Sequence, residues 1–396
     1  MNEHPILGQV VLGYCPMIGR QRTITATRLT VFPQRPEATP DARDLLQALG
    51  GCWPEGGEPL VLNLAGESLL RDALACEPPL HMSLEVPAFM AADAQHEAAL
   101  AALHARGNTL YLKGRPATEL PRAALACFRQ SIIEFADDRR SGPEAAGGAV
   151  RGVAFVQSGV TRASDVEESF RRGAVAVLGW PIDEPVTRGH GKAVAPDLSV
   201  IVELINRVDR QESIDRLEAV LTNDPTLAFR LVRYINSAAF GLRVEIGSFR
   251  HAIMMLGYQK LKRWLALLLA SASTDPSMKP VMFSAVRRGL FMEELVRSAG
   301  DEQMSSEVFI CGVFSLLDCM MAQPFEQLLR SIPVPQDVHD ALVHGSGRFR
   351  PYLDLVRAVE QESLFDIRSA AESLMLSHAE INRALLRALA TARQLD

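Results

Sequence analysis

The chain has 396 residues, of which 48% are hydrophobic and 22% charged, and its formal net charge is -6. This composition is typical of an ordinary globular protein and excludes both a disordered chain and a broadly basic nucleic-acid binder. The length predicts two domains, each large enough for its own core. The longest apolar run, Trp264 to Ala270, is far shorter than the roughly 20 residues of a membrane span. The first residues also lack a charged region followed by a cleavage signal, so we expect a cytoplasmic protein with no membrane partner.

The first half of the sequence alternates short β-branched runs with helical segments. The predicted strands include residues 23–32, 60–64, 81–86, 109–112, 152–156 and 175–180. Such alternation predicts βα units that form a parallel sheet or a barrel. Glycines, charges and a proline interrupt the pattern at residues 187–196, which we interpret as a linker. We therefore predict an α/β domain over residues 1–186 and an all-helical domain over residues 197–396.

The six cysteines form no Cys-x-x-Cys pair, and most of them lie in apolar surroundings. A reduced cysteine in such surroundings behaves as a small hydrophobic residue. The sequence therefore predicts neither a disulfide framework nor a cysteine zinc site.

Three sequence pieces in the first half carry a family resemblance through their order along the chain. They are VLNLAGESLL (61–70), HMSLEVP (81–87) and GAVAVLGWPIDEP (173–185). With them, residues 8–186 resemble the EAL domain family, bacterial barrel enzymes that hydrolyse cyclic di-GMP. The resemblance implies a TIM-like β/α barrel and places Asn63 and Glu85 at two of the family's metal-binding positions.

Most of the chemistry that such hydrolysis needs is missing from this chain. Several carboxylates must converge on divalent cations that activate a water and neutralise the phosphodiester. Where the family has Glu-Ala-Leu followed by Leu-Arg, this chain reads Thr-Arg-Leu-Thr-Val at residues 27–31. Lys113 and Gly114 replace two expected aspartates, Gln157 and Val160 replace two glutamates, and Leu178 replaces a glutamine. We therefore predict no catalytic residue, no metal and no cofactor, and regard Asn63 and Glu85 as remnants of a metal site.

The strongest signal of the second half lies between residues 224 and 273. Asp224 and Pro225 can begin a helix, and NSAAFG at residues 236–241 can form the tight turn that ends it. Gly257 suits the left-handed conformation at the end of a following helix. This pattern is similar to the HDOD domain family, whose motif maps onto Asp224, Asn236, Ser237, Gly241 and Gly257. The family resembles HD-type metal-dependent phosphohydrolases that have lost their ligands, and it serves in signalling or interaction. Where a hydrolase would carry His-Asp, this chain has Ser315 to Asp318.

One literal His-Asp pair occurs at His339 and Asp340, with His344 five residues later. On a helix of 3.6 residues per turn, His344 would lie about 140° away from His339. We therefore interpret this stretch as the start of a solvated helix rather than as a metal site.

Basic residues gather in and around the same HDOD block. Lys260, Lys262 and Arg263 follow Gly257, at the helix end where the macrodipole disfavours cations. Together with Arg233 and Arg243 they form a candidate basic face for a carboxylate-rich partner or a phosphate, although a purely solvated face is the alternative. Because cations are unfavourable at this helix end, replacing all three residues after Gly257 by Ala should leave the melting temperature nearly unchanged or raise it. If the face serves a partner, the same variant should lose binding or signalling while remaining folded.

Taken together, the two resemblances place the chain in the EAL-HDOD (YuxH-like) class of bacterial signal-transduction proteins. They imply a catalytically inactive regulator that acts through an unidentified protein partner in a pathway linked to cyclic di-GMP, such as motility, biofilm or stress control. One alternative is an effector that binds cyclic di-GMP, another nucleotide or nucleic acid without turnover. The other is a residual phosphodiesterase. The residues argue against nucleic-acid binding and against tight cyclic di-GMP binding, because the barrel lacks most of the groups that would hold the nucleotide.

Overall fold

The computed structural model describes residues 4–35, 39–53, 58–116, 120–138, 153–183, 196–222, 249–271 and 276–392. The chain divides into two compact units: Met1–Glu184 with Arg357–Arg383, and Pro185–Val356 with Ala384–Asp396. The predicted linker at 187–196 lies almost wholly outside the described residues. The sequence-based division assigned everything after it to one helical domain. The structure instead assigns residues 357–383, here called the C-terminal segment, to the first unit.

The first unit is a closed barrel whose eight described strands follow one another in the order β1 to β8. Neighbours from β2 to β8 are parallel, whereas β1 is antiparallel to both β2 and β8. This barrel confirms the predicted fold class. The strands are β1 (Val10–Gly19), β2 (Ile24–Pro33), β3 (Leu60–Leu64), β4 (Met82–Pro87), β5 (Leu110–Lys113), β6 (Phe128–Glu134), β7 (Ala154–Val160) and β8 (Ala176–Gly179).

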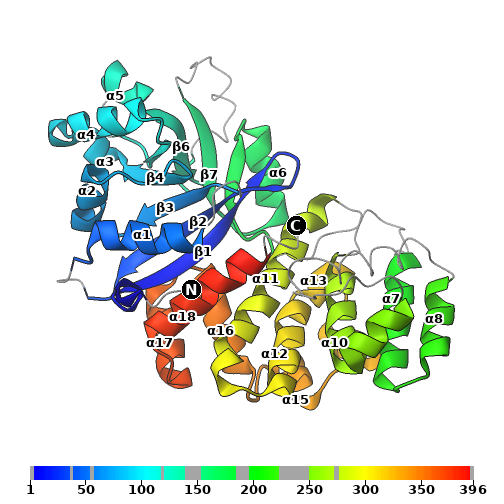
Figure 1. The fold of residues 1–396 in the computed structure, drawn as a ribbon. Coiled ribbons are helices and arrows are strands. Elements are labelled where there is room, and N and C mark those ends of the chain that lie inside the picture. The colour runs from blue at the N-terminus through cyan, green and yellow to red at the C-terminus, as the bar shows by residue number, and fades with distance from the viewer. Residues whose placement is uncertain are drawn as a thin grey trace. The chain divides into compact units, whose positions relative to one another are not determined.

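Helices lie outside the ring of strands, as the blue-to-green half of Figure 1 shows. Two of them begin at aspartates whose side chains accept hydrogen bonds from the first turn: Asp41 from the N–H of Asp44 at 2.9 Å, and Asp93 from that of Gln95 at 3.0 Å. Such caps satisfy N–H groups that have no partner inside the helix. The helices are α1 (Ala42–Cys52), α2 (Glu67–Ala75), α3 (Ala88–Ala91), α4 (Ala94–Ala105), α5 (Arg122–Ala126) and α6 (Ala163–Arg171), preceded by a 3-10 turn at Pro5–Gly8.

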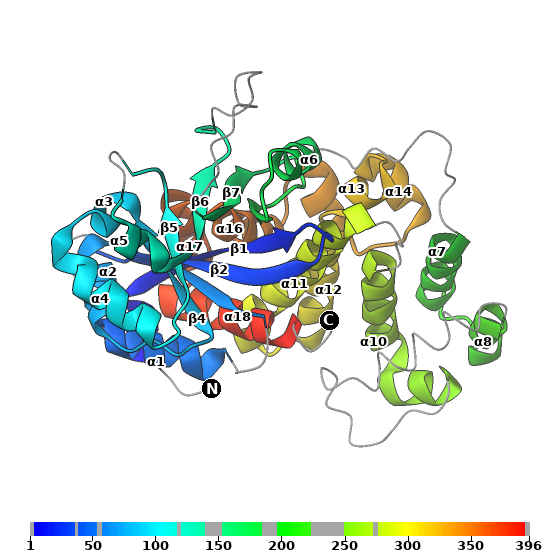
Figure 2. The same ribbon diagram turned by 90° about the horizontal axis from the view of Figure 1, so that it is seen from above.

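The C-terminal segment packs on the barrel through α17 (Leu364–Leu374), which contacts β1 (Figure 2). The buried side chain of Asn382 accepts a hydrogen bond from the N–H of Leu12 at 3.1 Å. It also donates to the carbonyls of Leu7 and Val10, both at 2.8 Å. Three backbone groups beside β1 are thereby satisfied by one amide from the distant end of the chain.

The regular elements among the described residues of the second unit are all helices. Helices α11 and α12 cross closely, because a Cβ on Gly312 would lie 2.7 Å from the carbonyl of Arg288. The helices are α7 (Pro196–Asp209), α8 (Ile214–Thr222), α10 (Phe249–Ser271), α11 (Lys279–Val296), α12 (Glu302–Phe314), α13 (Leu317–Met321), α14 (Phe325–Ser331) and α15 (Gln336–His339). Short 3-10 turns occupy Pro276–Met278 and Arg297–Ala299. A π-helical turn at Asp340–His344 and α16 (Arg350–Glu360) follow α15, and α18 is His378–Ala392.

Three further features bear on the sequence predictions. The helix α10 is interrupted at Gly257, whose φ of 72° and ψ of 170° are not helical. None of the helices described combines the length and apolar character needed to cross a bilayer. All six cysteines are free thiols.

Candidate functional site at the barrel mouth

Five polar side chains from four neighbouring strands meet inside the barrel. Arg28 and Thr30 come from β2, Asn63 from β3, Glu85 from β4 and Lys113 from β5. Asn63 and Lys113 stand near the carboxyl ends of parallel strands, the end at which barrel enzymes place their active sites. Four of the five are buried, with Glu85 only 1% exposed. Buried polar groups of this kind need partners, and each of the five has one.

Arg28 lies between two carboxylates. Its Nε and Nη2 donate to Glu85 at 2.7 and 3.0 Å, and its Nη1 donates to Glu362 of the C-terminal segment at 3.0 Å. Burial alone would lower the pKa of the guanidinium, but the charges of Glu85 and Glu362 outweigh burial and raise that pKa above its ordinary value. The two-bond geometry with Glu85 is the strong form of an arginine–carboxylate contact.

A chain of hydrogen bonds continues from Glu362 to the other strands. The hydroxyl of Thr30 donates to Glu362 at 2.5 Å and accepts from the amide of Asn63 at 3.0 Å. The ammonium of Lys113 donates to the side-chain oxygen of Asn63 at 2.8 Å. Burial lowers the pKa of Lys113, while Glu85 opposes that shift. The six residues thus form one connected network, here called the mouth network: Arg28, Thr30, Asn63, Glu85, Lys113 and Glu362.

Glu362 reaches the network from a turn between α16 and α17. Its φ of 54° lies in the left-handed region, which costs a residue other than glycine about 1–3 kcal/mol. Space for this turn exists because β1 carries Gly13, where a Cβ would lie 3.1 Å from the Cα of Glu362. The indole of Trp180 donates to the carbonyl of Glu360 at 2.9 Å and fixes the start of the turn. The strained conformation is therefore held by contacts on both sides.

The structure brings together the two predicted metal-site remnants, but each is bound to a cation of the protein. Glu85 is bound to Arg28, and Asn63 to Lys113. Among the described residues, no group of three His, Cys, Asp or Glu ligands gathers inside the barrel. Elsewhere on the rim, Gln157 donates to the carbonyl of Ile133 at 2.8 Å. The arrangement stabilises the barrel mouth and offers a divalent cation no open carboxylate pair.

Three members of the network were missed by sequence reasoning. Arg28 and Thr30 were noted only as part of a replaced motif, although an arginine among the β-branched residues of a strand is a signal of a buried charge with a partner. Glu362 lies 334 positions from Arg28 in the chain, and nothing in its local pattern distinguishes it.

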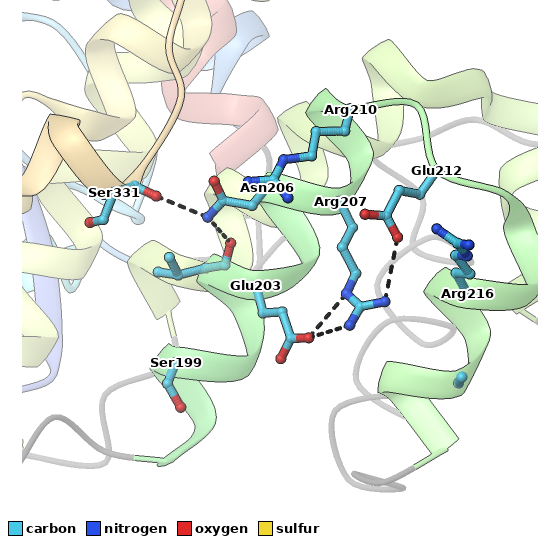
Figure 3. Close-up of a pocket in the computed structure, with 10 residues that line it drawn as sticks. Ser199, Glu203, Asn206, Arg207, Arg210, Glu212, Arg216 and Ser331 are labelled. Carbon is cyan, nitrogen blue, oxygen red and sulfur yellow. Dashed lines mark hydrogen bonds and ion pairs between the residues drawn. The ribbon is translucent and has the colours of Figure 1, made fainter.

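The second unit contains an open pocket of about 700 Å³ between α7, α8 and the end of α14 (Figure 3). Arg207 points between Glu203 and Glu212, with bonds of 2.6 and 3.4 Å. Arg210 and Arg216 also line the pocket, and both are exposed. Within the described part of the chain, neither side chain has a hydrogen-bond or ion-pair partner. The pocket therefore presents two uncommitted guanidinium groups, which suit a carboxylate or phosphate.

The predicted basic face is largely engaged inside the protein. Lys262 is bound to Asp209 at 2.5 Å, and Arg263 makes two bonds of 2.6 Å to Glu293. The guanidinium of Arg263 also lies 4.2 Å from the centre of the Phe309 ring. Burial raises the pKa of Glu293, although Arg263 acts in the opposite direction. Only Lys260 is exposed; Arg233 and Arg243 lie outside the described residues.

The predicted HDOD motif is described only in part. Asp224, Asn236, Ser237 and Gly241 lie outside the described residues, and Gly257 is the break within α10. At the position where a hydrolase would carry its His-Asp pair, the buried hydroxyl of Ser315 accepts from Arg288 at 3.1 Å. That hydroxyl also donates to the carbonyl of Gly312 at 2.7 Å. An arginine from α11 is thus bonded to the residue at this position.

The described residues form two parts, a closed barrel with helices outside it and a helical unit. This is the two-domain architecture that the sequence predicts. The HDOD domain family matches residues 195–330, so the helical unit carries an HDOD domain. The relatives below and this domain fit an EAL-HDOD protein, which confirms the resemblance found in the sequence.

The chain is 26% identical over 222 residues to the uncharacterized protein YuxH of Bacillus subtilis, covering 54% of this chain and 53% of that protein. It is 28% identical over 170 residues to the cyclic di-GMP phosphodiesterase CdgJ of Vibrio cholerae, covering 42% and 39%. The chain thus spans about half the length of one of these curated relatives and less of the other.

Solved structures with similarity to the barrel include the FimX EAL domain from Pseudomonas aeruginosa bound to c-di-GMP. It is 14% identical with a TM-score of 0.32, over 46% of this chain and 92% of that one. The EAL-like domain protein YdiV is 13% identical with a TM-score of 0.32, over 44% and 94%.

Proposed function

We propose that this protein is a catalytically inactive regulator that acts through protein–protein contact in a pathway linked to cyclic di-GMP. The link is supported by the similarity to CdgJ, a protein named as a cyclic di-GMP phosphodiesterase, and by the EAL-HDOD arrangement. The observation that carries inactivity is the mouth network. Its two carboxylates are bound to Arg28, and its single amide is bound to Lys113.

Metal-dependent hydrolysis requires carboxylates that are free to hold cations, because the cations lower the pKa of the attacking water. A divalent cation entering the barrel would have to displace Arg28 from both Glu85 and Glu362. It would then remain beside two protein cations in a site of low polarity, where repulsion between like charges is strong. The network therefore favours a closed, structural barrel mouth over a catalytic one.

The test is turnover of cyclic di-GMP by the purified full chain with Mg²⁺ or Mn²⁺, measured by chromatography of the products. We expect no hydrolysis above that of the Glu85→Ala variant, which serves as the matched control. Hydrolysis by the wild type that Glu85→Ala abolishes would disprove inactivity.

A partner of acidic character is supported by the pocket of the second unit. Arg210 and Arg216 are exposed there and uncommitted within the described residues, while Arg207 is bound to two glutamates. We propose that this pocket, rather than the Lys262 and Arg263 side chains, receives carboxylates of the partner.

Affinity purification of the full chain from its native cells, with the variant Arg210→Glu plus Arg216→Glu beside it, tests this assignment. We expect the double variant to lose a partner that the wild type retains, because charge reversal repels carboxylates. Arg122→Glu, a substitution of an exposed arginine on the barrel unit, is the control and should retain the partner. Equal recovery with the double variant would place the contact elsewhere.

The alternative is an effector that binds a nucleotide or nucleic acid without turnover, for which the same two arginines are the supporting observation. Nucleic-acid binding of this kind weakens steeply as salt increases, because cations are released from the phosphates on binding. Calorimetry of the full chain with cyclic di-GMP distinguishes the two. A dissociation constant in the low micromolar range or below, about -8 kcal/mol, would favour the effector.

A further inference from the structure

Three metal-ligating side chains meet where α15 passes into the π-helical turn. They are His339, Asp340 and His344, and one ligand atom from each lies within 4.8 Å of those from the other two. The two imidazole rings are 5.3 Å apart between centres and inclined at 61°. This cluster lies beyond the residues matched by the HDOD family and shares no residue with the mouth network.

The π-helical turn is what brings the two histidines together. On the regular helix that the sequence predicts, residues five apart point in different directions. Here Asp340–His344 is π-helical, and the i→i+5 hydrogen bonding of such a turn brings residues five apart towards the same side. The turn ends at Gly345, whose φ is 61°. The sequence-based expectation of a 140° separation is therefore wrong, because it assumed 3.6 residues per turn.

Buried neighbours fix which way the cluster faces. Val338 and Ala341 are fully buried, so they hold the apolar side of the segment against the unit. His339 and Asp340 are half-buried and His344 is exposed. His344 consequently faces solvent, and His339 and Asp340 lie partly covered beside it.

The polar atoms of the cluster differ in how they are bonded. The Nδ1 of His339 is shielded from solvent and has no hydrogen-bond partner within the described residues. It lies 3.9 Å from Oδ1 of Asp340, too far for a hydrogen bond. That Oδ1 in turn accepts from the amide of Gln336 at 2.8 Å, the kind of outer contact that orients a metal-binding carboxylate.

The ligand types indicate the class of ion. Two imidazoles and one carboxylate suit Zn²⁺ and similar transition metals, whereas Mg²⁺ and Ca²⁺ prefer oxygen ligands alone. Bonds of 2.0–2.1 Å would require the ligand atoms to approach to about 3.3 Å. The side chains of His339 and Asp340, whose Nδ1 and Oδ1 atoms are 3.9 Å apart, would therefore have to shift together with the exposed His344. The nearby cations do not oppose this, because Arg348 is bound to Glu307 and Asp337, and Arg350 to Asp354.

We propose that His339, Asp340 and His344 form a surface site for one divalent transition-metal ion of the Zn²⁺ class, with a fourth coordination position open. Zn²⁺ bound there would join α15 to the far end of the π-helical turn. The open position would accept water or a ligand atom from another molecule.

Calorimetric titration of the metal-free full chain with Zn²⁺ tests the proposal, with Co²⁺ absorption as a second readout and Mg²⁺ as the negative probe. We expect one Zn²⁺ per chain at this site, a visible Co²⁺ spectrum and no heat with Mg²⁺. His344→Ala should weaken Zn²⁺ binding by at least about tenfold, and Asp340→Asn should do so to a similar degree. The control His104→Ala replaces an exposed histidine of the barrel unit and should bind as the wild type does.

Because His344 is exposed, the His344→Ala variant should melt at the wild-type temperature in the absence of metal. Zn²⁺ should raise the melting temperature of the wild type and of His104→Ala, but not that of His344→Ala, because only an ion that binds the folded state stabilises it. Absence of Zn²⁺ binding to the wild type, or equal binding by His344→Ala, would overturn the proposal.

Discussion

Glu362 is the residue whose replacement should reveal most about the mouth network. Its carboxylate accepts from Arg28 at 3.0 Å and from Thr30 at 2.5 Å, and its side chain is 19% exposed. Hydrogen bonds to a charged group contribute about 1.5–3 kcal/mol each. Because Arg28 keeps Glu85 and the site is partly hydrated, we take the lower end and expect Glu362→Ala to lose about 2–4 kcal/mol of unfolding free energy.

A comparison with Glu362→Gly separates the lost bonds from the strained backbone. Both variants lose the same two hydrogen bonds, but glycine adopts a φ of 54° without the cost that alanine retains. Glu362→Gly should therefore be about 1 kcal/mol more stable than Glu362→Ala, while remaining less stable than the wild type.

Urea unfolding followed by tryptophan fluorescence measures these differences, since the indole of Trp180 is bonded to the same turn. Hydrogen exchange at β2 gives a local readout in the same unit, with faster exchange expected in both variants. If Glu362→Ala were as stable as the wild type, the network would contribute nothing. If it were more stable than Glu362→Gly, the assignment of strain to the turn would be refuted.

Three further outcomes follow from the described contacts. Arg263→Ala should lose about 2–4 kcal/mol of unfolding free energy, measured by heat or urea, because it leaves the half-buried Glu293 unpaired. The control Lys260→Ala should change that free energy by less than about 0.5 kcal/mol, and equal effects of the two substitutions would show that the Arg263–Glu293 pair does not stabilise the fold. Burial lowers the pKa of Lys113 in the folded protein, so between that lowered value and 10.5 the unfolded chain binds more protons than the folded chain. Across this pH range the free energy of unfolding should therefore rise with pH in the wild type relative to Lys113→Met. Parallel stability profiles of the two proteins would exclude this. Asn382→Ala should destabilise the barrel unit by about 2–4 kcal/mol and speed amide exchange at the start of β1, and unchanged exchange there would argue against the three bonds.

The sequence predicts the barrel because most of its strands are short β-branched runs between helical segments. The strand β1 escaped that reasoning because all ten of its residues are buried, so no alternation of apolar and polar side chains marks it. Gly13 and Pro16 within it also resemble turn residues. The closeness of Gly13 to Glu362 explains the glycine, but only once the fold is known.

The candidate site was predictable only as far as local pattern carries information. Asn63 and Glu85 were found because neighbouring residues resemble known strands, whereas Glu362 depends on a contact across the whole chain. The basic residues after Gly257 were correctly located on a helix that restarts there, yet their partners Asp209 and Glu293 come from other helices. Pairing between distant elements is set by packing, which no local periodicity records.

In both halves of the chain an arginine is bonded to a side chain at a position where the family resemblance predicts a metal ligand. Removing ligands alone would leave buried polar groups without partners, at a cost of about 1–3 kcal/mol for each group. In the barrel, Arg28 satisfies Glu85 and Glu362 together; in the HDOD domain, Arg288 satisfies the hydroxyl of Ser315. In each case a protein cation is bonded to a side chain at a position where the resemblance predicts a metal ligand. This is the physical reason for proposing a role in binding rather than catalysis for the whole chain.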